Sequence, residues 1–551
     1  MNPPVIAIGL DAADPQLLET WMDQGHLKTL QRLRQGGTYG RLLNLDSYRA
    51  ETPWTTFLTG VLPEETGYWG PIKYNPDTYQ AQEVRAYKFK DYPPFYALGD
   101  QYRVAVFDMP QSALSEQVNG WQVLAWGAHS AQVDSQSSPS DLFQTVVDRH
   151  GAHPMFNRDY ADCRNLEALE RLQRGMETGI SRRAKICQDW LQQKPWDLLL
   201  TVFGETHTAG HYHWHLSQPH PIHKVGVPQA EDGLLKIYQA VDRAISEIVD
   251  AAPQEANILV FAAHGMGANV MDLPSMLFLP ELLYRWSFPG QYGLAFSRRR
   301  KSLKSPKTAF KKRAWIGEVW DLKYEKNPLR SWLRQNLPTR LYHRLEALLG
   351  KGDGISLASP YEQQAASDPL FWQPANWYKP LWPQMKAFAL PSFSEGYVRI
   401  NVKGREAQGI VSPKDYDAVC EQITTELKAL KDIRYGHPMV DKVIRTRQNA
   451  LEQDPKLPDA DLIIIWQEEF ATDGVESPAF GRIGPVPYLR TGSHRAEGFL
   501  LGNGPNFDSG ESLPEDTKAL DLAPTILDLM GAQPPSYIEG RSILKQTTGI
   551  R

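Results

Sequence analysis

The segment from residue 198 to residue 215, LLLTVFGETHTAGHYHWH, constrains the fold more than any other part of the chain. Residues 198–203 have the length and composition of a buried strand, which ends at Gly204. Four histidines follow: His207, His211, His213 and His215. An open α/β sheet builds its site from side chains placed just after its strands. A solvated histidine-rich loop, or histidines packed as polar core residues, is the alternative interpretation.

Other apolar runs also have an Asp or His close to one end. Residues 5–10 end at Asp11, residues 258–261 precede His264, and His494 lies just before residues 498–501. Helical patterns alternate with these strands, for example over residues 233–250. The sequence therefore predicts an α/β fold with a central, mostly parallel sheet between helices.

The polar residues at these strand ends fit one shared site. His207 and His211 are four residues apart, so on a helical turn they share a face and can bind one ion. Histidine nitrogens and carboxylate oxygens are ligands that zinc accepts. His213 and His215 are expected to be lining or surface residues.

The character of the chain changes in its middle part, which is rich in tryptophan and lacks strand–helix alternation. We predict an α/β core in two parts, residues 1–275 and 396–551, with an inserted cap or lid over residues 276–395. Residues 298–313 hold nine Lys or Arg and no acid. This basic run either binds a phosphate-bearing substrate or an anionic surface, or forms a mobile solvated loop.

Composition excludes several classes of protein. Of the 551 residues 42% are hydrophobic and 22% charged, as in ordinary soluble globular proteins. The net charge of -5 does not suggest a partner that is a nucleic acid polymer. Three widely spaced cysteines give no disulfide framework, and neither a signal peptide nor an 18-residue apolar run is present. These features predict a cytoplasmic protein without a membrane span, of undetermined oligomeric state.

Thr52 and Pro53 form a favourable helix start, with threonine as the N-cap and proline at the first helical position. Glu51 and Thr52 then lie where free backbone N–H groups favour an anion. An ordinary N-cap, worth about 1 kcal/mol and without any chemistry, is the alternative role of Thr52.

The order and spacing of six segments resemble the alkaline phosphatase superfamily, specifically its type I phosphodiesterase/nucleotide pyrophosphatase family. The resemblance covers nearly the whole core, and the segments are IGLDAADP, TPWTTFLTGVLPEETGYWG, ETHTAGHYHW, AAHGMG, GSHRAEGFLLGNGP and DLAPTILDLMGAQPPSYIEGRSIL. It implies metal-dependent hydrolysis of phosphate esters, by a phosphodiesterase or pyrophosphatase, through a phosphorylated threonine or serine. The implied cofactor is Zn²⁺, one or two ions, or Mn²⁺, and the implied substrate is a small anionic phosphate ester.

The resemblance also implies roles for individual residues. Asp11, His211, His264 and His494 match metal-binding positions of the family. Three positions depart from the family pattern: His207 and Ala263 stand where the family has Asp, and Ala50 stands at the position of the nucleophile.

These departures leave several roles open. His207, His211 and His494 still form a neutral three-histidine set, which suits zinc. The second ion keeps Asp11 and His264, with Glu51 or Glu205 as auxiliary ligands. Thr52 becomes the nucleophile if the preceding loop is shortened by two residues; otherwise a water attacks the substrate directly, or there is no reaction.

Two further hypotheses therefore accompany the hydrolase. A catalytically degenerate family member would bind a ligand or a partner, and a transferase or isomerase would use the same phosphorylated intermediate. For the hydrolase, metal affinity is predicted to fall below roughly pH 6, because histidine ligands must be neutral.

Overall fold

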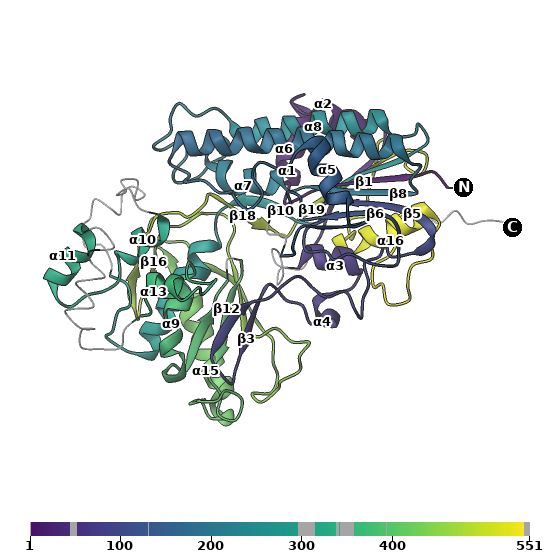
Figure 1. The fold of residues 1–551 in the computed structure, drawn as a ribbon. Helices are drawn as coiled ribbons and strands as arrows, with labels where there is room; N and C mark the ends of the chain where they lie inside the picture. Colours follow the sequence, from purple (N-terminus) through teal and green to yellow (C-terminus); the bar gives the residue numbers. More distant parts are fainter. Residues whose placement is uncertain are drawn as a thin grey trace.

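A computed structural model describes residues 2–44, 52–129, 132–295, 314–337, 341, 357–392 and 394–544 of the chain. These residues form two lobes (Figure 1). The first lobe is built on a nine-stranded sheet, in the order β20 (Glu511–Ser512), β2 (Thr38–Leu42), β19 (Gly498–Asn503), β9 (Asn257–Ala262), β1 (Val5–Leu10), β8 (Leu198–Phe203), β5 (Gly99–Phe107), β6 (Val118–Leu124) and β7 (Gln136–Ser138).

The middle of this sheet is parallel. Strand β1 pairs in parallel with both β8 and β9, and β5 pairs in parallel with both β8 and β6. Antiparallel pairing occurs at β19 and β7, toward the edges. The predicted α/β class with a mostly parallel sheet is confirmed.

Helices cover both faces of the sheet, as the continuous apolar runs of its central strands require. Along β1, Ile6 and Ile8 belong to one hydrophobic cluster, whereas Val5 and Ala7 belong to another on the opposite face. The first cluster includes side chains of α1 (Pro15–Asp23), α2 (Lys28–Gln35), α6 (Leu166–Gln193) and α8 (Gly233–Ala251). The second includes α3 (Pro53–Thr59) and α16 (Leu522–Met530), on the other side of the sheet in Figure 1.

The histidine-rich segment is a helix, α7 (Glu205–Ser217), that begins directly after β8. Nearly every residue of α7 is buried, so the alternative of a solvated loop is wrong. His213 and His215 are also buried, contrary to the expectation that they line the site or face solvent. His213 Nε2 donates to the Leu169 carbonyl at 3.2 Å, and His215 Nδ1 lies 3.1 Å from Thr491 Oγ1.

The second lobe contains a four-stranded sheet with its own hydrophobic cluster. Its order is β11 (Ala387–Leu390), β12 (Gly396–Ile400), β15 (Leu462–Trp466) and β14 (Val440–Arg445), and helices α9 (Leu279–Ser287) and α15 (Tyr416–Lys428) pack in the same cluster. The chain returns to the large sheet only at β19. The lobe is thus wider than the predicted cap of residues 276–395, because the buried strands after residue 395 join the smaller sheet.

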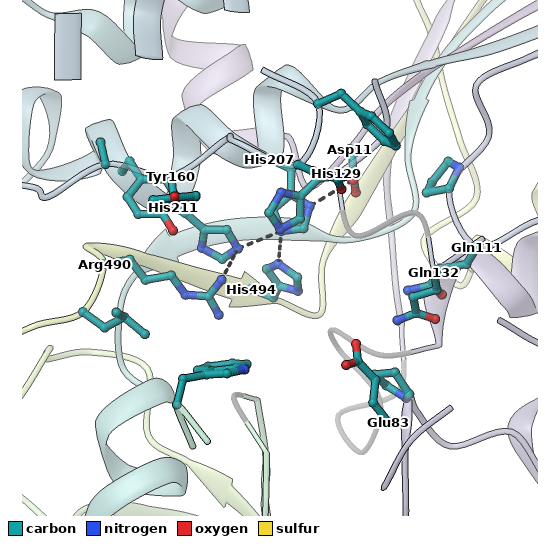
Figure 2. Close-up of a pocket in the computed structure, with 18 of the residues that line it drawn as sticks. Asp11, Glu83, Gln111, His129, Gln132, Tyr160, His207, His211, Arg490 and His494 are labelled. Atoms are coloured by element: carbon teal, nitrogen blue, oxygen red, sulfur yellow. Dashed lines mark hydrogen bonds and ion pairs between the residues drawn. The ribbon is translucent and has the colours of Figure 1, made fainter. Parts of the chain in front are cut away.

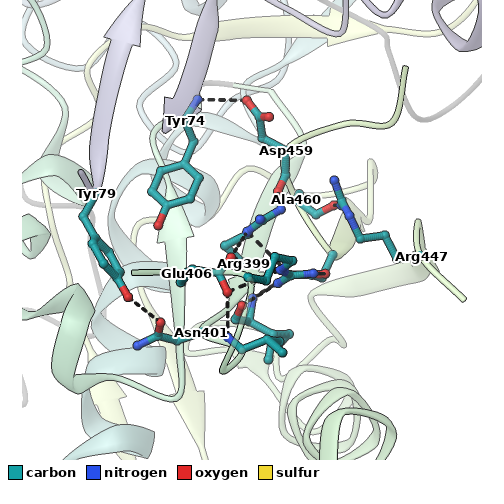
Figure 3. Close-up of polar contacts among 12 residues, drawn as sticks. Tyr74, Tyr79, Arg399, Asn401, Glu406, Arg447, Asp459 and Ala460 are labelled. Carbon is teal, nitrogen blue, oxygen red and sulfur yellow. Dashed lines mark hydrogen bonds and ion pairs between the residues drawn. The ribbon is translucent and has the colours of Figure 1, made fainter. Parts of the chain in front are cut away.

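A hairpin that precedes β5 in the chain connects the two lobes. Its strands, β3 (Ile72–Asn75) and β4 (Gln80–Glu83), pair antiparallel and lie beside β12 in Figure 1. Figure 3 shows two of its anchors: Tyr79 Oη donates to Asn401 Oδ1 at 2.7 Å, and the Tyr74 backbone N–H donates to Asp459 Oδ2 at 2.9 Å. We call β3 and β4 the clasp.

Charged side chains are paired beneath these anchors (Figure 3). The fully buried Arg405 binds both oxygens of Asp461, at 2.7 and 2.8 Å, and Arg399 Nε donates to Glu406 Oε1 at 2.7 Å. Buried charges require such partners, since an unpaired one is costly. The surface that receives the clasp is therefore specified by polar pairing as well as by apolar packing.

Two expectations from composition concern the whole chain. All three cysteines are free and buried. Among the described residues, every helix is too short or too polar to span a bilayer.

Candidate active site

The topology of the large sheet brings the predicted site residues together. Strands β9, β1 and β8 are neighbours and run parallel, so the residues after them meet at one edge of the sheet. Asp11 follows β1, α7 with His207 and His211 follows β8, and His264 follows β9.

His494 reaches this edge by a different route. It lies on β18 (Gly492–Arg495), which pairs antiparallel with β10 (Gly265–Ala268) directly after His264. The ring centroids of His494 and His264 are 4.7 Å apart. This small two-stranded sheet brings together residues that are more than two hundred positions apart in the sequence.

Three histidine nitrogens converge in the site (Figure 2). His207 Nε2 lies 2.7 Å from His211 Nε2 and 2.9 Å from His494 Nε2. Two of these rings have their other nitrogen engaged by an acceptor. His207 Nδ1 lies 3.0 Å from Asp11 Oδ2, and His211 Nδ1 lies 2.8 Å from the Gly492 carbonyl oxygen.

These acceptors place the protons of both rings on Nδ1, so both Nε2 atoms carry lone pairs. Two lone pairs that face each other repel, unless a shared cation lies between them. Metal-binding histidines are typically held in this manner, with the non-ligating N–H donated to a carboxylate or carbonyl. The residues present therefore fit a divalent metal ion bound by His207, His211 and His494.

Burial keeps these imidazoles neutral. It lowers the pKa of His211 and His494 well below the usual value, and the nearby Arg490 and the other histidines lower both further. It also lowers the pKa of His207, although Asp11 opposes that shift. Burial would raise the pKa of Asp11, but His207, His264 and Trp54 outweigh it and hold the value at about 2. The site thus combines an anionic carboxylate with neutral nitrogen donors.

Asp11 and His264 form a second pair of potential ligands. His264 Nε2 is 3.8 Å from Asp11 Oδ1, and that oxygen accepts the Trp54 indole N–H at 2.9 Å. Both ring nitrogens of His264 are buried without a hydrogen-bond partner among the described residues. A buried polar atom left unpaired is costly, and the ring nitrogen that carries the lone pair can bind an added cation. Ala263 contributes no ligand atom here.

The predicted auxiliary carboxylates are those of Glu205 and Glu51. Glu205 lies on the first turn of α7, but its Oε1 is 3.0 Å from His153 Nε2 and 3.7 Å from Arg183 Nη2. Its Oε1 therefore serves a buried ion pair, whereas its Oε2 is buried without a hydrogen-bond partner among the described residues. The role of Glu205 as an auxiliary metal ligand stays a prediction. Glu51 and Ala50 lie outside the described residues, as does the basic run 298–313.

Thr52 precedes α3, and Pro53 is the first helical residue, as predicted. The Thr52 side chain makes no capping hydrogen bond. Its hydroxyl is buried and has no partner among the described residues, and Thr52 is not among the residues that line the neighbouring cavity. The ordinary N-cap role is therefore wrong, and the hydroxyl stays a potential partner for another group.

Sequence reasoning did not identify Arg490. Its guanidinium binds Asp272 through two hydrogen bonds, Nε to Oδ2 at 2.6 Å and Nη2 to Oδ1 at 3.1 Å, while Nη1 lies 2.8 Å from His211 Nε2. Figure 2 shows the guanidinium beside the histidine cluster. A fixed guanidinium of this kind suits a phosphate oxygen. No sequence pattern around Arg490 marks this role.

His129 is the second residue that the sequence analysis missed. Its Nδ1 is paired with Asp159, and its ring centroid is 4.3 Å from that of His207. Burial lowers the pKa of His129, but Asp159 outweighs burial and raises the pKa above the usual value. His129 lies a few residues after β6 (Val118–Leu124), which is buried at its end, so the signal that identified Asp11, a polar residue after a buried strand, was present.

A large cavity of about 1090 Å³ opens beside these residues. The histidines and Arg490 lie on one side of it in Figure 2, and Glu83, Gln111 and Gln132 lie across from Arg490. Its other lining residues include many aromatic side chains from both lobes: Trp54, Phe156, Tyr160, Tyr212, Trp315, Phe371, Trp372 and Tyr488. The cavity is large enough for a drug-sized organic ester.

Comparison with solved structures gives matches of low sequence identity. Phosphonoacetate hydrolase from Sinorhizobium meliloti 1021, in complex with phosphonoformate, is 14% identical, with 96% of each chain covered and a TM-score of 0.48. Human ectonucleotide pyrophosphatase/phosphodiesterase 5 is 11% identical over 97% of this chain and 96% of its own, with a TM-score of 0.47. Wild-type alkaline phosphatase PafA is 12% identical over 98% of each chain, with a TM-score of 0.49.

No curated protein matches the chain. The model of the family described as type I phosphodiesterase / nucleotide pyrophosphatase matches residues 5–353. That range includes the strand ends that carry Asp11, His207, His211 and His264, and it covers well over half of the chain. The protein belongs to the type I phosphodiesterase/nucleotide pyrophosphatase family of phosphoric ester hydrolases.

Proposed function

We propose that the protein hydrolyses small phosphate diesters or pyrophosphates with a zinc ion bound by His207, His211 and His494. The observation that carries the proposal is the convergence of three Nε2 atoms, at 2.7 and 2.9 Å, beside Arg490 at a large cavity. When bound, such an ion supplies a Lewis acid that neutralises negative charge on the phosphoryl oxygens.

The side chains of the site have separate tasks in this proposal. Asp11 and the Gly492 carbonyl orient two of the imidazoles through their Nδ1 atoms. Arg490, held by Asp272, donates to a phosphoryl oxygen of the substrate, so its guanidinium exchanges the contact with His211 for one with the substrate. The aromatic residues of the cavity exclude water from the organic part of the ester.

Asp11 and His264 support a second, weaker cation site in the proposal, and Mn²⁺ is the alternative ion for either site. The unpaired nitrogens of His264 favour this second site. It has only two protein ligands among the described residues, so we expect it to bind metal less tightly than the three-histidine site.

Thr52 is the proposed nucleophile, supported by its buried and unpaired hydroxyl. Attack by the hydroxyl would form a phosphothreonine and release the alcohol or phosphate leaving group, and water would then cleave that ester. The alternative is direct attack by water in a single step, in which case the threonine hydroxyl does not take part.

Metal content and turnover of the purified full-length protein test the proposal. We expect zinc or manganese in the protein, loss of bis(4-nitrophenyl) phosphate hydrolysis after chelation, and recovery after zinc is returned. His211→Ala should lose both metal and turnover. His213→Ala is the matched control, because His213 lies on the same helix and bonds to Leu169 instead.

One result would overturn the proposal: metal-supplemented protein cleaves no phosphate, phosphonate or sulfate ester, and His211→Ala leaves its metal content unchanged. The second candidate function, ligand binding without catalysis, is favoured by Ala263 at the second site. If Ala263→Asp creates turnover that the wild-type protein lacks, this second candidate is correct. The cytoplasmic location predicted from the sequence stays a prediction.

A further inference from the structure

His129 meets the histidine cluster from a loop that no predicted site residue shares. One ring nitrogen from each of His129, His207 and His211 lies within 4.8 Å of the other two. The His129 ring centroid is 4.3 Å from that of His207 and 6.1 Å from that of His211. His129 also lines the cavity, together with His207, His211 and His494.

Asp159 fixes the orientation of this imidazole. Its Oδ2 is paired with His129 Nδ1, and the same oxygen accepts a hydrogen bond from Thr208 Oγ1 at 3.1 Å. Thr208 lies on α7, next to His207 in the sequence. The carboxylate that holds His129 is therefore attached to the helix that carries the other two histidines of the group.

His129 repeats the pattern of the neighbouring histidines. In each of the three rings Nδ1 faces an acceptor: Asp159 for His129, Asp11 for His207 and the Gly492 carbonyl for His211. Nε2 is then the nitrogen left for a metal. A structural surface histidine needs no such arrangement.

We propose that His129 is a further nitrogen ligand of the metal ion at His207 and His211, and that Asp159 positions it. The inference rests on the proposed function. It also explains how the site compensates for the histidine at position 207, where the family resemblance implied a carboxylate. The carboxylate of Asp159 returns one negative charge to the site through an imidazole rather than by direct coordination.

Zinc titration of chelator-treated, full-length protein by isothermal calorimetry tests this ligand. We expect Asp159→Asn to weaken zinc binding by about 10-fold, the lower end for groups that orient metal ligands, and His129→Ala to weaken it more. His129→Gln removes the donor nitrogen at similar volume and should match His129→Ala. His150→Ala is the matched control, because His150 forms a carboxylate pair with Asp189 and does not line the cavity.

The visible absorption of the cobalt(II)-substituted protein gives a second readout, because it depends on the number and geometry of ligands. We expect the spectrum to change in His129→Ala and to stay unchanged in His150→Ala. Wild-type affinity and spectrum in His129→Ala, with metal lost only in His211→Ala, would overturn this inference alone. A higher KM with unchanged metal affinity would also overturn it and would make His129 a substrate-binding residue. Absence of metal binding by the wild-type protein would overturn the proposed function as well.

Discussion

Replacement of Arg183 by methionine tests how the core supports the site. The Arg183 side chain is fully buried, with Nη2 at 2.8 Å from Asp108 Oδ2 and 3.7 Å from Glu205 Oε1. Asp108 also accepts the backbone N–H groups of Trp126 and Gly127, just before His129. Glu205 begins α7, two residues before His207. One guanidinium therefore connects the two segments that carry these histidines.

The cost of Arg183→Met follows from the partners that remain. Removal of one member of a buried ion pair costs about 3 to 5 kcal/mol. Asp108 keeps its backbone donors and Glu205 keeps His153 at 3.0 Å, so we expect the lower end, about 3 kcal/mol. We also expect zinc affinity to fall by about 10-fold, as for other residues that orient metal ligands.

Urea unfolding, followed by tryptophan fluorescence, and zinc calorimetry provide the measurements. Arg285→Met is the matched control: Arg285 is equally buried, with Nε at 2.7 Å from Glu281 Oε1, but it lies in the second lobe. We expect a similar loss of stability and unchanged zinc affinity. A destabilisation of Arg183→Met below about 1 kcal/mol, or equal loss of zinc affinity in both variants, would refute the reasoning.

Three further predictions follow from the site and its surroundings. Thr52→Val should abolish diester hydrolysis without loss of zinc, and Thr52→Ser should retain it; measurable turnover by Thr52→Val would instead favour attack by water. Zinc affinity should stay level from pH 7.5 to 6 and fall on further acidification, because burial lowers the pKa of His211 and His494; a tenfold fall already between pH 8 and 6.5 would contradict this. Burial also lowers the pKa of His213 and His215 to about 4 in the folded protein, compared with about 6.5 in the unfolded chain. On acidification the unfolded chain therefore binds protons at these histidines before the folded protein does, and the folded state loses stability as the pH falls below about 6.5. At pH 5 the loss of stability is about 2 kcal/mol for each histidine. The urea midpoint of His213→Gln should therefore change less between pH 7 and pH 5 than that of the wild-type protein.

Much of the site could be predicted because its residues follow strands. Asp11, His207 and His264 come directly after apolar runs, and the carboxyl ends of parallel neighbours meet at one edge. The spacing of His207 and His211 also indicated that a helical turn would place them on one face, and the segment is helix α7. The apolar runs identify the strands, and the parallel pairing of those strands places the residues that follow them at one edge of the sheet.

The remaining features depend on pairings that no local pattern encodes. Asp159 and His129 are thirty residues apart and lie outside periodic segments. Arg490 forms a hydrogen bond with Asp272, and a long insertion separates these two residues in the sequence. Strands β12 and β15 have the apolar composition of core strands, and only their hydrogen-bonded partners reveal that they form the smaller sheet. The composition of these strands therefore does not reveal where the second lobe ends.

The clasp has a consequence for substrate size. Ile72 and Glu83 of the clasp line the cavity, while Tyr79 at its far end is anchored to Asn401 in the second lobe. One wall of the cavity is thus a hairpin that hydrogen bonds of Tyr74 and Tyr79 anchor to the second lobe. A wall held in this way limits the length of the group that is attached to the phosphate of the substrate.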